Sequence, residues 1–234
     1  MPAFNLIALD ADDTLWHNET LYRKSRDEFV RLLGDAASEQ TIVDTLDATE
    51  GRNLELFGFG IKAYTLSLIE TAVELTGGKI SGAEIQHIIE LARGLLNSPV
   101  ELLDGVRETL PLLAAGYRLM LLTKGDLLDQ ERKLSHSGLA EYFSEVEIIS
   151  RKDQASYARV LRRYSISPDR FMMVGNSLRS DVLPVLALGG SGVFIPFEIV
   201  WLHEQAETPP ADARGFYELK RFSELPALLA TLSS

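Results

Sequence analysis

Residues 4–15 read FNLIALDADDTL, a short apolar run that ends in Asp10 and is followed closely by Asp12 and Asp13. An apolar run of this length, bounded by acids, predicts a strand that is buried on both faces, as in a parallel sheet. Ligands of open parallel sheets bind beyond the carboxyl ends of the strands, so we expect Asp10 and Asp12 where chemistry takes place. Two carboxylates around one turn create a negative potential that a divalent cation such as Mg²⁺ neutralises.

Strand and helix patterns alternate through the rest of this part of the chain. Four further strands are expected at residues 117–122, 146–149, 171–174 and 192–195. Helical patterns lie at residues 106–115, 127–137, 154–164, 182–188 and 222–232. Ser167 and Pro168 resemble a helix N-cap followed by proline in the first turn, and Pro111 is expected to kink its helix. The alternation predicts an α/β fold with a Rossmann-like parallel sheet.

Residues 18–99 interrupt the alternation with helical patterns and no convincing strand. Apolar residues recur at helical spacing in residues 21–33 and 63–75, and the sequence from Ser81 to Glu84 matches a capping box for a further helix through Leu96. The sequence therefore predicts an α/β core domain of residues 1–17 and 100–234, with an all-helical cap of residues 18–99 inserted after the first strand. Residues 54–64, which combine two glycines with aromatic residues, are a candidate substrate-selecting loop of the cap, although packing is the more common role of such a stretch.

The composition excludes several classes of protein. The 234 residues contain no cysteine, which rules out disulfides and thiolate chemistry. The net charge of −11 disfavours a nucleic acid or an anionic membrane as the main partner. No run approaches the roughly 20 apolar residues of a membrane span, and the first apolar run lacks the basic flank of a signal peptide, so a cytoplasmic enzyme is expected.

Three later segments place polar groups at the ends of predicted strands. Thr123 and Lys124 end one strand and are suited to binding phosphate oxygens. Lys152 follows another strand and is suited to pairing with phosphate as a point charge. Asn176 and Asp181 follow a third strand and offer oxygen ligands to a hard cation. Each segment alone is ambiguous, but together they predict one site at the carboxyl edge of the sheet.

The two acids of the first segment divide the chemistry between them. Asp10, held ionised by a metal, is suited to attack a phosphorus atom, and Asp12 is suited to deliver a proton to the leaving group. Asp10, Asp12, Asn176 and Asp181 are the oxygen ligands that the sequence offers to the metal. We expect a Mg²⁺-dependent hydrolase of a small phosphorylated metabolite, and the sequence leaves open whether it is a monomer or a homodimer.

The four segments, in their order and spacing, resemble the motifs of the haloacid dehalogenase-like hydrolases. The resemblance covers residues 4–17 and 103–197. It implies that Asp10 is the nucleophile, Asp12 the general acid and base, Thr123 the hydroxyl of the second motif and Lys152 the lysine of the third. Residues 175–181 match the acidic fourth motif, and the helical insert has the placement of the family's small cap.

Two residues depart from the family pattern and leave alternatives open. Asn176 stands where the family usually has aspartate, and Lys124 stands where asparagine is common; the extra cation is a candidate compensation for a more weakly held metal. A 2-haloacid dehalogenase, which displaces halide without an acid at position 12, is one alternative. A non-catalytic regulatory protein with a degraded metal site is the other. The presence of Asp12 favours phosphoryl transfer.

Overall fold

The computed structural model describes residues 3–210 and 212–233. The chain divides into two compact units. The first consists of Met1–His17, Val100–Lys124 and Glu131–Ser234, and the second of Asn18–Pro99 and Gly125–Gln130. Residues 125–130 therefore lie with the helical unit, although the sequence places them in the core domain.

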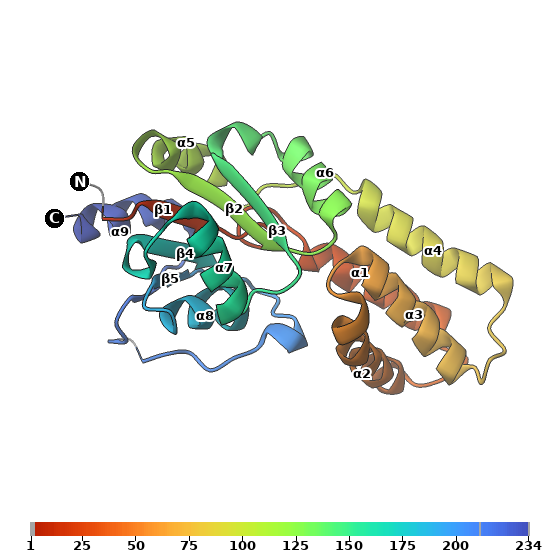
Figure 1. The fold of residues 1–234 in the computed structure, drawn as a ribbon. Coiled ribbons are helices and arrows are strands. Elements are labelled where there is room, and N and C mark those ends of the chain that lie inside the picture. Colours follow the sequence, from red (N-terminus) through yellow and green to blue (C-terminus); the bar gives the residue numbers. More distant parts are fainter. Residues whose placement is uncertain (1–2, 211, 234) are drawn as a thin grey trace. The chain divides into compact units, whose positions relative to one another are not determined.

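A parallel sheet of six strands forms the centre of the first unit (Figure 1). The strands are β1 (Leu6–Leu9), β2 (Leu119–Lys124), β3 (Glu145–Ile149), β4 (Phe171–Gly175), β5 (Ser191–Phe194) and β6 (Phe216–Glu218). Their order is β3-β2-β1-β4-β5-β6, and every neighbouring pair is parallel. The strand order reverses between β1 and β4, the position at which open α/β sheets bind their ligands. The predicted Rossmann-like fold is confirmed.

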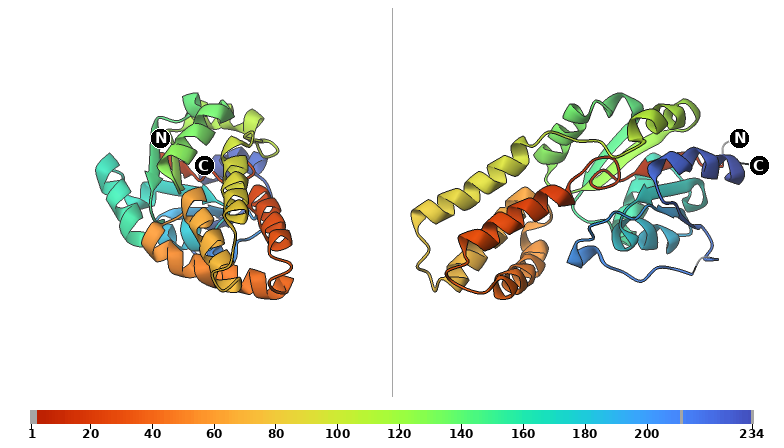
Figure 2. Two further views of the ribbon diagram at one scale, coloured as in Figure 1. Left: turned by 90° about the vertical axis from the view of Figure 1, so that its right-hand side faces the viewer. Right: turned by 180° about the vertical axis from the view of Figure 1, so that it is seen from behind.

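Alternate residues of the buried strands face two separate apolar layers. Ile7 and Leu9 of β1 pack in one cluster with residues of α5 (Val106–Gly116) and α9 (Leu225–Leu232). Leu6 and Ala8 pack in another with residues of α7 (Gln154–Tyr164). Both faces of the sheet are therefore covered, as Figures 1 and 2 show, and this accounts for the continuous apolar runs of the strands.

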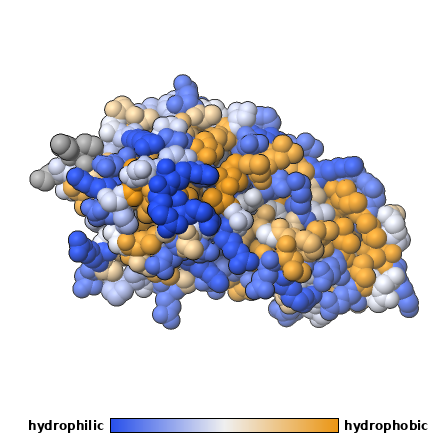
Figure 3. All heavy atoms as spheres, viewed as in Figure 1, coloured by the Kyte–Doolittle hydropathy of each residue, from blue (hydrophilic) through white to orange (hydrophobic). Residues whose placement is uncertain are grey.

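The second unit is helical. Its helices are α1 (Glu19–Leu32), α2 (Glu39–Phe57), α3 (Ile61–Leu75) and α4 (Gly82–Asn97). Its core includes Phe29, Leu46 and Leu68. Ser81 and Glu84 form the predicted capping box at the start of α4. The unit exposes large apolar side chains, which are Leu56, Phe57, Leu66, Val73, Leu127 and Leu128. Apolar surface is visible on it in Figure 3.

Several predictions of local structure require correction. Ser167 makes no side-chain cap, and Pro168–Arg170 forms only a 3₁₀ turn because β4 begins at the next residue. In place of one helix over residues 182–188, a π-helical turn at Leu178–Val182 leads into α8 (Leu183–Leu186). Pro111 lies inside α5, as the sequence predicts.

The remaining elements are α6 and short turns. α6 spans Leu127–Ser137, and further 3₁₀ turns lie at Ala140–Tyr142, Leu202–Glu204 and Phe222–Glu224. Within the described part of the chain, every helix is too short or too polar to cross a membrane.

Candidate active site

Asp10 lies at the carboxyl end of β1, and its two carboxylate oxygens have different surroundings. Its backbone N–H donates to the carbonyl of Val174 at 2.9 Å, which fixes the chain at the point where the strand order reverses. Oδ1 accepts a hydrogen bond from the Lys152 ammonium group, and Oδ2 lies 3.4 Å from Thr14 Oγ1. Because the side chain is only 10% exposed, its orientation is set by these neighbours rather than by solvent.

Lys152 connects two carboxylates that come from different strands. Its ammonium group bonds to Asp10 and, at 2.7 Å, to Oδ1 of Asp181. Burial acts to lower the pKa of Lys152, but the two carboxylates outweigh it and the pKa is raised. The lysine is therefore charged at neutral pH and offers a fixed cation beside Asp10.

Both oxygens of Asp181 are occupied by protein donors. Oδ1 accepts from Lys152, and Oδ2 accepts from the backbone N–H of Ser177 at 3.0 Å. Burial raises the pKa of Asp181 to about 7, although Lys152 acts to lower it. A side chain at Gly175 would collide with this carboxylate, which explains the glycine at the end of β4. Asp181 is thus placed to orient Lys152.

The amide oxygen of Asn176 and one carboxylate oxygen of Asp10 share Thr14 as a neighbour. Asn176 Oδ1 and Asp10 Oδ2 each lie 3.4 Å from Thr14 Oγ1. A carboxylate and an amide oxygen near one point suit a hard cation such as Mg²⁺. Within residues 3–210 and 212–233, three or more acidic or histidine side chains do not gather into a metal-binding group. This is consistent with an amide at position 176, where the family usually has an acid.

Asp12 projects from a tight turn that follows β1. The turn is closed by hydrogen bonds from the N–H groups of Thr14 and Leu15 to the carbonyl of Ala11, and Asp13 has a positive φ of 58°. The Asp12 carboxylate accepts from Trp16 Nε1 at 2.7 Å and from Lys133 Nζ at 3.0 and 3.2 Å. These donors fix the direction of the Asp12 carboxylate.

Thr123 and Lys124 end β2 in different environments. Thr123 is buried, with a relative exposure of 1%. The Lys124 ammonium group bonds to the Glu204 carboxylate and, at 2.9 Å, to Ser180 Oγ. The cation predicted to bind substrate is therefore paired with a carboxylate of this chain.

The structure brings most of the predicted residues together and adds others. Asp10, Thr14, Lys152, Asn176 and Asp181 form one connected set of contacts. Sequence reasoning missed Lys133 and Glu204, which follow no motif, and it missed Trp16, whose indole N–H bonds to Asp12.

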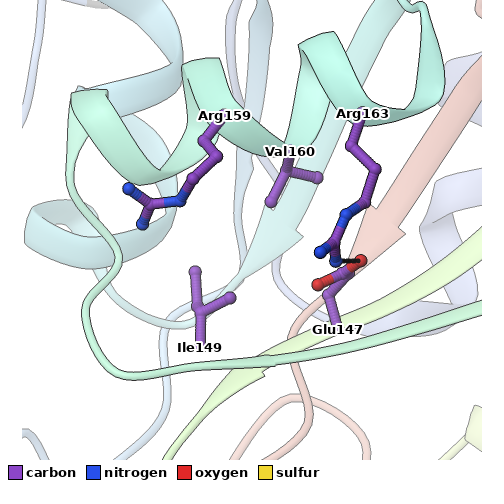
Figure 4. Close-up of a pocket in the computed structure, with 5 residues that line it drawn as sticks. All are labelled: Glu147, Ile149, Arg159, Val160 and Arg163. Atoms are coloured by element: carbon purple, nitrogen blue, oxygen red, sulfur yellow. Dashed lines mark hydrogen bonds and ion pairs between the residues drawn. The ribbon is translucent and has the colours of Figure 1, made fainter.

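A shallow hollow beside β3 and α7 contains none of the predicted site residues in its lining. It is lined by Glu147, Ile149, Arg159, Val160 and Arg163. Figure 4 shows Arg163 directed at Glu147, to which it bonds at 2.7 Å. Glu147 also accepts from Tyr164 at 2.6 Å, so its carboxylate is already engaged, and Arg159 donates to Ser156 Oγ at 3.0 Å.

Residues 4–189 match the haloacid dehalogenase-like hydrolases, in agreement with this geometry. The chain belongs to this family. A crystal structure of a haloacid dehalogenase-like family hydrolase from Xanthomonas campestris is 43% identical, covers 99% of this chain and 93% of its own, and superposes with a TM-score of 0.89.

Two more distant relatives have different activities in their names. Glyceraldehyde 3-phosphate phosphatase from Methanothermobacter thermautotrophicus is 24% identical over 204 residues, which are 82% of this chain and 86% of the relative. The structure of 2-haloacid dehalogenase from Pseudomonas syringae pv. tomato DC3000 is 22% identical and has a TM-score of 0.65, covering 97% of this chain and 99% of its own. The second of these likenesses shows the fold alone.

Proposed function

We propose that this hydrolase is a Mg²⁺-dependent phosphatase that cleaves a small phosphorylated metabolite through an aspartyl-phosphate intermediate. The observation that carries the proposal is the pair of carboxylates Asp10 and Asp12 on one turn, each fixed by its own lysine. A phosphate ester leaves as an alkoxide that needs a proton, whereas halide leaves without one, so the second acid favours phosphoryl transfer. The phosphatase among the relatives supports the same reading.

Mg²⁺ would be held by Asp10, the backbone carbonyl of Asp12 and Asn176. Among the two candidates of the fourth motif, Asn176 is the better direct ligand, because both oxygens of Asp181 are engaged by Lys152 and Ser177. When bound, the metal neutralises phosphate charge as the reaction proceeds.

The protein groups divide the remaining work. Thr123 and Lys152 bind phosphate oxygens, and Asp10 attacks phosphorus in line with the leaving oxygen. Asp12 protonates that oxygen as the ester bond breaks, and the phosphoryl group is then bound to Asp10. A water molecule deprotonated by Asp12 attacks the intermediate, which releases phosphate and restores the Asp10 carboxylate. Positioning and charge neutralisation supply most of the acceleration in phosphoryl transfer.

The test is hydrolysis of p-nitrophenyl phosphate by the purified protein, with and without Mg²⁺, beside the variant Asp10→Asn. We expect metal-dependent release of p-nitrophenol that falls to background in the variant, because an amide cannot form the intermediate. Asp35→Asn is the matched control, since it removes the same charge at an exposed position of the helical unit. Substantial turnover by Asp10→Asn would rule out this nucleophile.

Asn176 is the observation that favours a second candidate, a 2-haloacid dehalogenase. An amide in place of an acid weakens a metal site, and halide displacement does not need one. Release of chloride from 2-chloropropionate by the wild-type protein, with no hydrolysis of phosphate esters across several divalent metals, would select this alternative.

A further inference from the structure

Glu204 lies in the connection between β5 and β6, far in sequence from the family motifs, and its carboxylate is largely buried. Its side chain is 14% exposed. Oε1 accepts from the Lys124 ammonium group, and Oε2 accepts from Ser177 Oγ and, at 2.6 Å, from Ser180 Oγ. The Glu204 carboxylate therefore accepts from one cation and two hydroxyl groups. These three donors use most of the hydrogen bonds that a carboxylate can accept.

The two serines belong to the loop that carries the candidate metal ligand. Ser177 follows Asn176 directly, and its hydroxyl group also accepts from the backbone N–H of Ser180 at 3.0 Å. Ser180 precedes Asp181, and its carbonyl accepts from the buried Tyr157 hydroxyl at 3.0 Å. Glu204 thus fixes Ser177, which adjoins the candidate metal ligand Asn176. It also fixes Ser180, which adjoins Asp181, the residue that orients Lys152.

A backbone contact joins the same two segments. Arg179 Nη1 donates to the carbonyl of His203 at 3.0 Å. Residues 203–204 therefore contact residues 177, 179 and 180, so the β5–β6 connection is docked on this loop at several adjacent points.

Glu204 also changes the charge beside the candidate metal site. Lys124 extends from β2 to Ser180, which follows β4, and β1 with Asp10 at its end lies between these strands. An unpaired ammonium group there would repel a divalent cation, and the Glu204 carboxylate neutralises it. Because Lys124 is paired with Glu204, it does not supply the extra positive charge that would compensate for the missing carboxylate at position 176.

We propose that Glu204 is a positioning residue that sets the Mg²⁺ affinity of the site, by fixing residues 176–181 through the two serines and by neutralising Lys124. The inference rests on the Mg²⁺ site of the proposed function. Residues that orient the direct ligands of a metal typically change its affinity by about 10- to 100-fold when they are replaced.

The experiment is calorimetric titration of Mg²⁺ into the metal-free protein, with no substrate present. Glu204→Gln is expected to weaken Mg²⁺ binding by about tenfold. At saturating Mg²⁺ its kcat for p-nitrophenyl phosphate is expected to recover to near the wild-type value, because Glu204 contacts Lys124, Ser177 and Ser180 and not Asp10 or Asp12. Glu207→Gln is the matched control: it removes the same charge from an exposed position three residues away, and its Mg²⁺ affinity is expected to equal that of wild type.

A purely structural role predicts a different outcome. In that case Glu204→Gln lowers the melting temperature but binds Mg²⁺ as wild type does, and this result overturns the inference. If Glu204→Gln does not fold, Ser180→Ala takes its place, because it removes one link of Glu204 to the loop without changing any charge. Wild-type Mg²⁺ affinity in that variant is likewise contrary to the inference.

The calorimetric result separates this inference from the proposed function. A protein that binds Mg²⁺ with Glu204-dependent affinity, but hydrolyses no phosphate ester, supports the inference and contradicts the phosphatase proposal. A Mg²⁺-dependent phosphatase whose metal affinity does not depend on Glu204 contradicts the inference and supports the phosphatase proposal.

Discussion

Lys133 and Trp16 hold the Asp12 carboxylate in one direction. We therefore expect the effect of removing Lys133 on kcat to depend on whether the leaving group needs a proton. Lys133→Met leaves Asp12 without the ammonium group that contacts both of its oxygens. We expect kcat for an alkyl phosphate to fall about tenfold, a part of the roughly 10²–10⁴-fold that a positioned proton donor contributes. Hydrolysis of 2,4-dinitrophenyl phosphate, whose leaving group needs no proton, is expected to change little. Steady-state kinetics with the two esters measures the difference.

Lys133→Arg is the matched control for this prediction, because it keeps the charge and a donor. Its preference between the two esters should stay close to that of wild type. An equal loss with both esters in Lys133→Met would indicate that the lysine supports the fold of the site rather than the direction of Asp12.

Among single residues, those in motifs were predictable and their partners were not. Asp10, Lys152 and Asp181 follow strands of one parallel sheet, so the sheet alone brings them to one edge. Glu204 is 80 residues from Lys124, and Lys133 is 121 residues from Asp12. A charged residue in a surface connection or on a helix has no periodic pattern, and only the tertiary fold selects its partner.

At the scale of elements, the start of α3 depends on two glycines with the same unusual backbone. Gly58 has φ 75° and ψ −158°, and Gly60 has φ 115° and ψ 177°. For other residues this region costs about 1–3 kcal/mol. A Cβ at Gly60 would lie 2.8 Å from the backbone nitrogen of Asp126, whereas a Cβ at Gly58 meets nothing within 4 Å.

We therefore expect Gly60→Ala to be the more destabilising of two otherwise matched variants. Gly58→Ala and Gly60→Ala both place alanine in the unfavourable backbone region. Gly60→Ala adds a steric clash that costs about 1–3 kcal/mol. Urea denaturation of the two variants checks this difference. Equal free energies of unfolding would mean that the contact with Asp126 relaxes without cost.

Helix α4 and helix α2 show which elements a sequence reveals. The capping box of α4 is local, because Ser81 and Glu84 satisfy each other's backbone within one turn. The hydrophobic pattern of the sequence does not indicate α2, because the buried face of its C-terminal half is polar. Thr49, Glu50 and Asn53 are buried there. Asn53 bonds to Ser67 of α3 at 3.1 Å, so this interface is made by hydrogen bonds that hydrophobic periodicity does not detect. The edge strand β6 has three residues, too few for a pattern.

At the scale of the whole molecule, several buried or partly buried carboxylates are paired with cations in both units. Lys152 holds Asp10 and Asp181, Lys124 holds Glu204, and Arg26 bonds to Asp47 at 2.6 Å in the helical unit. In a chain of net charge −11, these pairs keep the interior near neutrality while the excess acids remain on the surface. Protonation of the carboxylates in acid leaves the cations buried and unpaired, which is strongly destabilising.

The pairing of Glu204 with Lys124 leads to a prediction about how the free energy of unfolding depends on pH. Burial acts to raise the pKa of Glu204, but Lys124 and the two serine hydroxyl groups outweigh it and lower the pKa from its ordinary value of 4.5. A carboxyl group whose pKa is lowered by folding contributes stability above its unfolded pKa and loses that contribution as the pH falls through its folded pKa. Wild type should therefore exceed Glu204→Gln in free energy of unfolding at pH 7, and the gap should narrow as the pH is lowered below 4.5. Urea denaturation at a series of pH values measures the gap, with Glu207→Gln expected to match wild type throughout. A gap that stays constant with pH would mean that the side chain of Glu204 stabilises the fold through packing, and that its charge has no part in it.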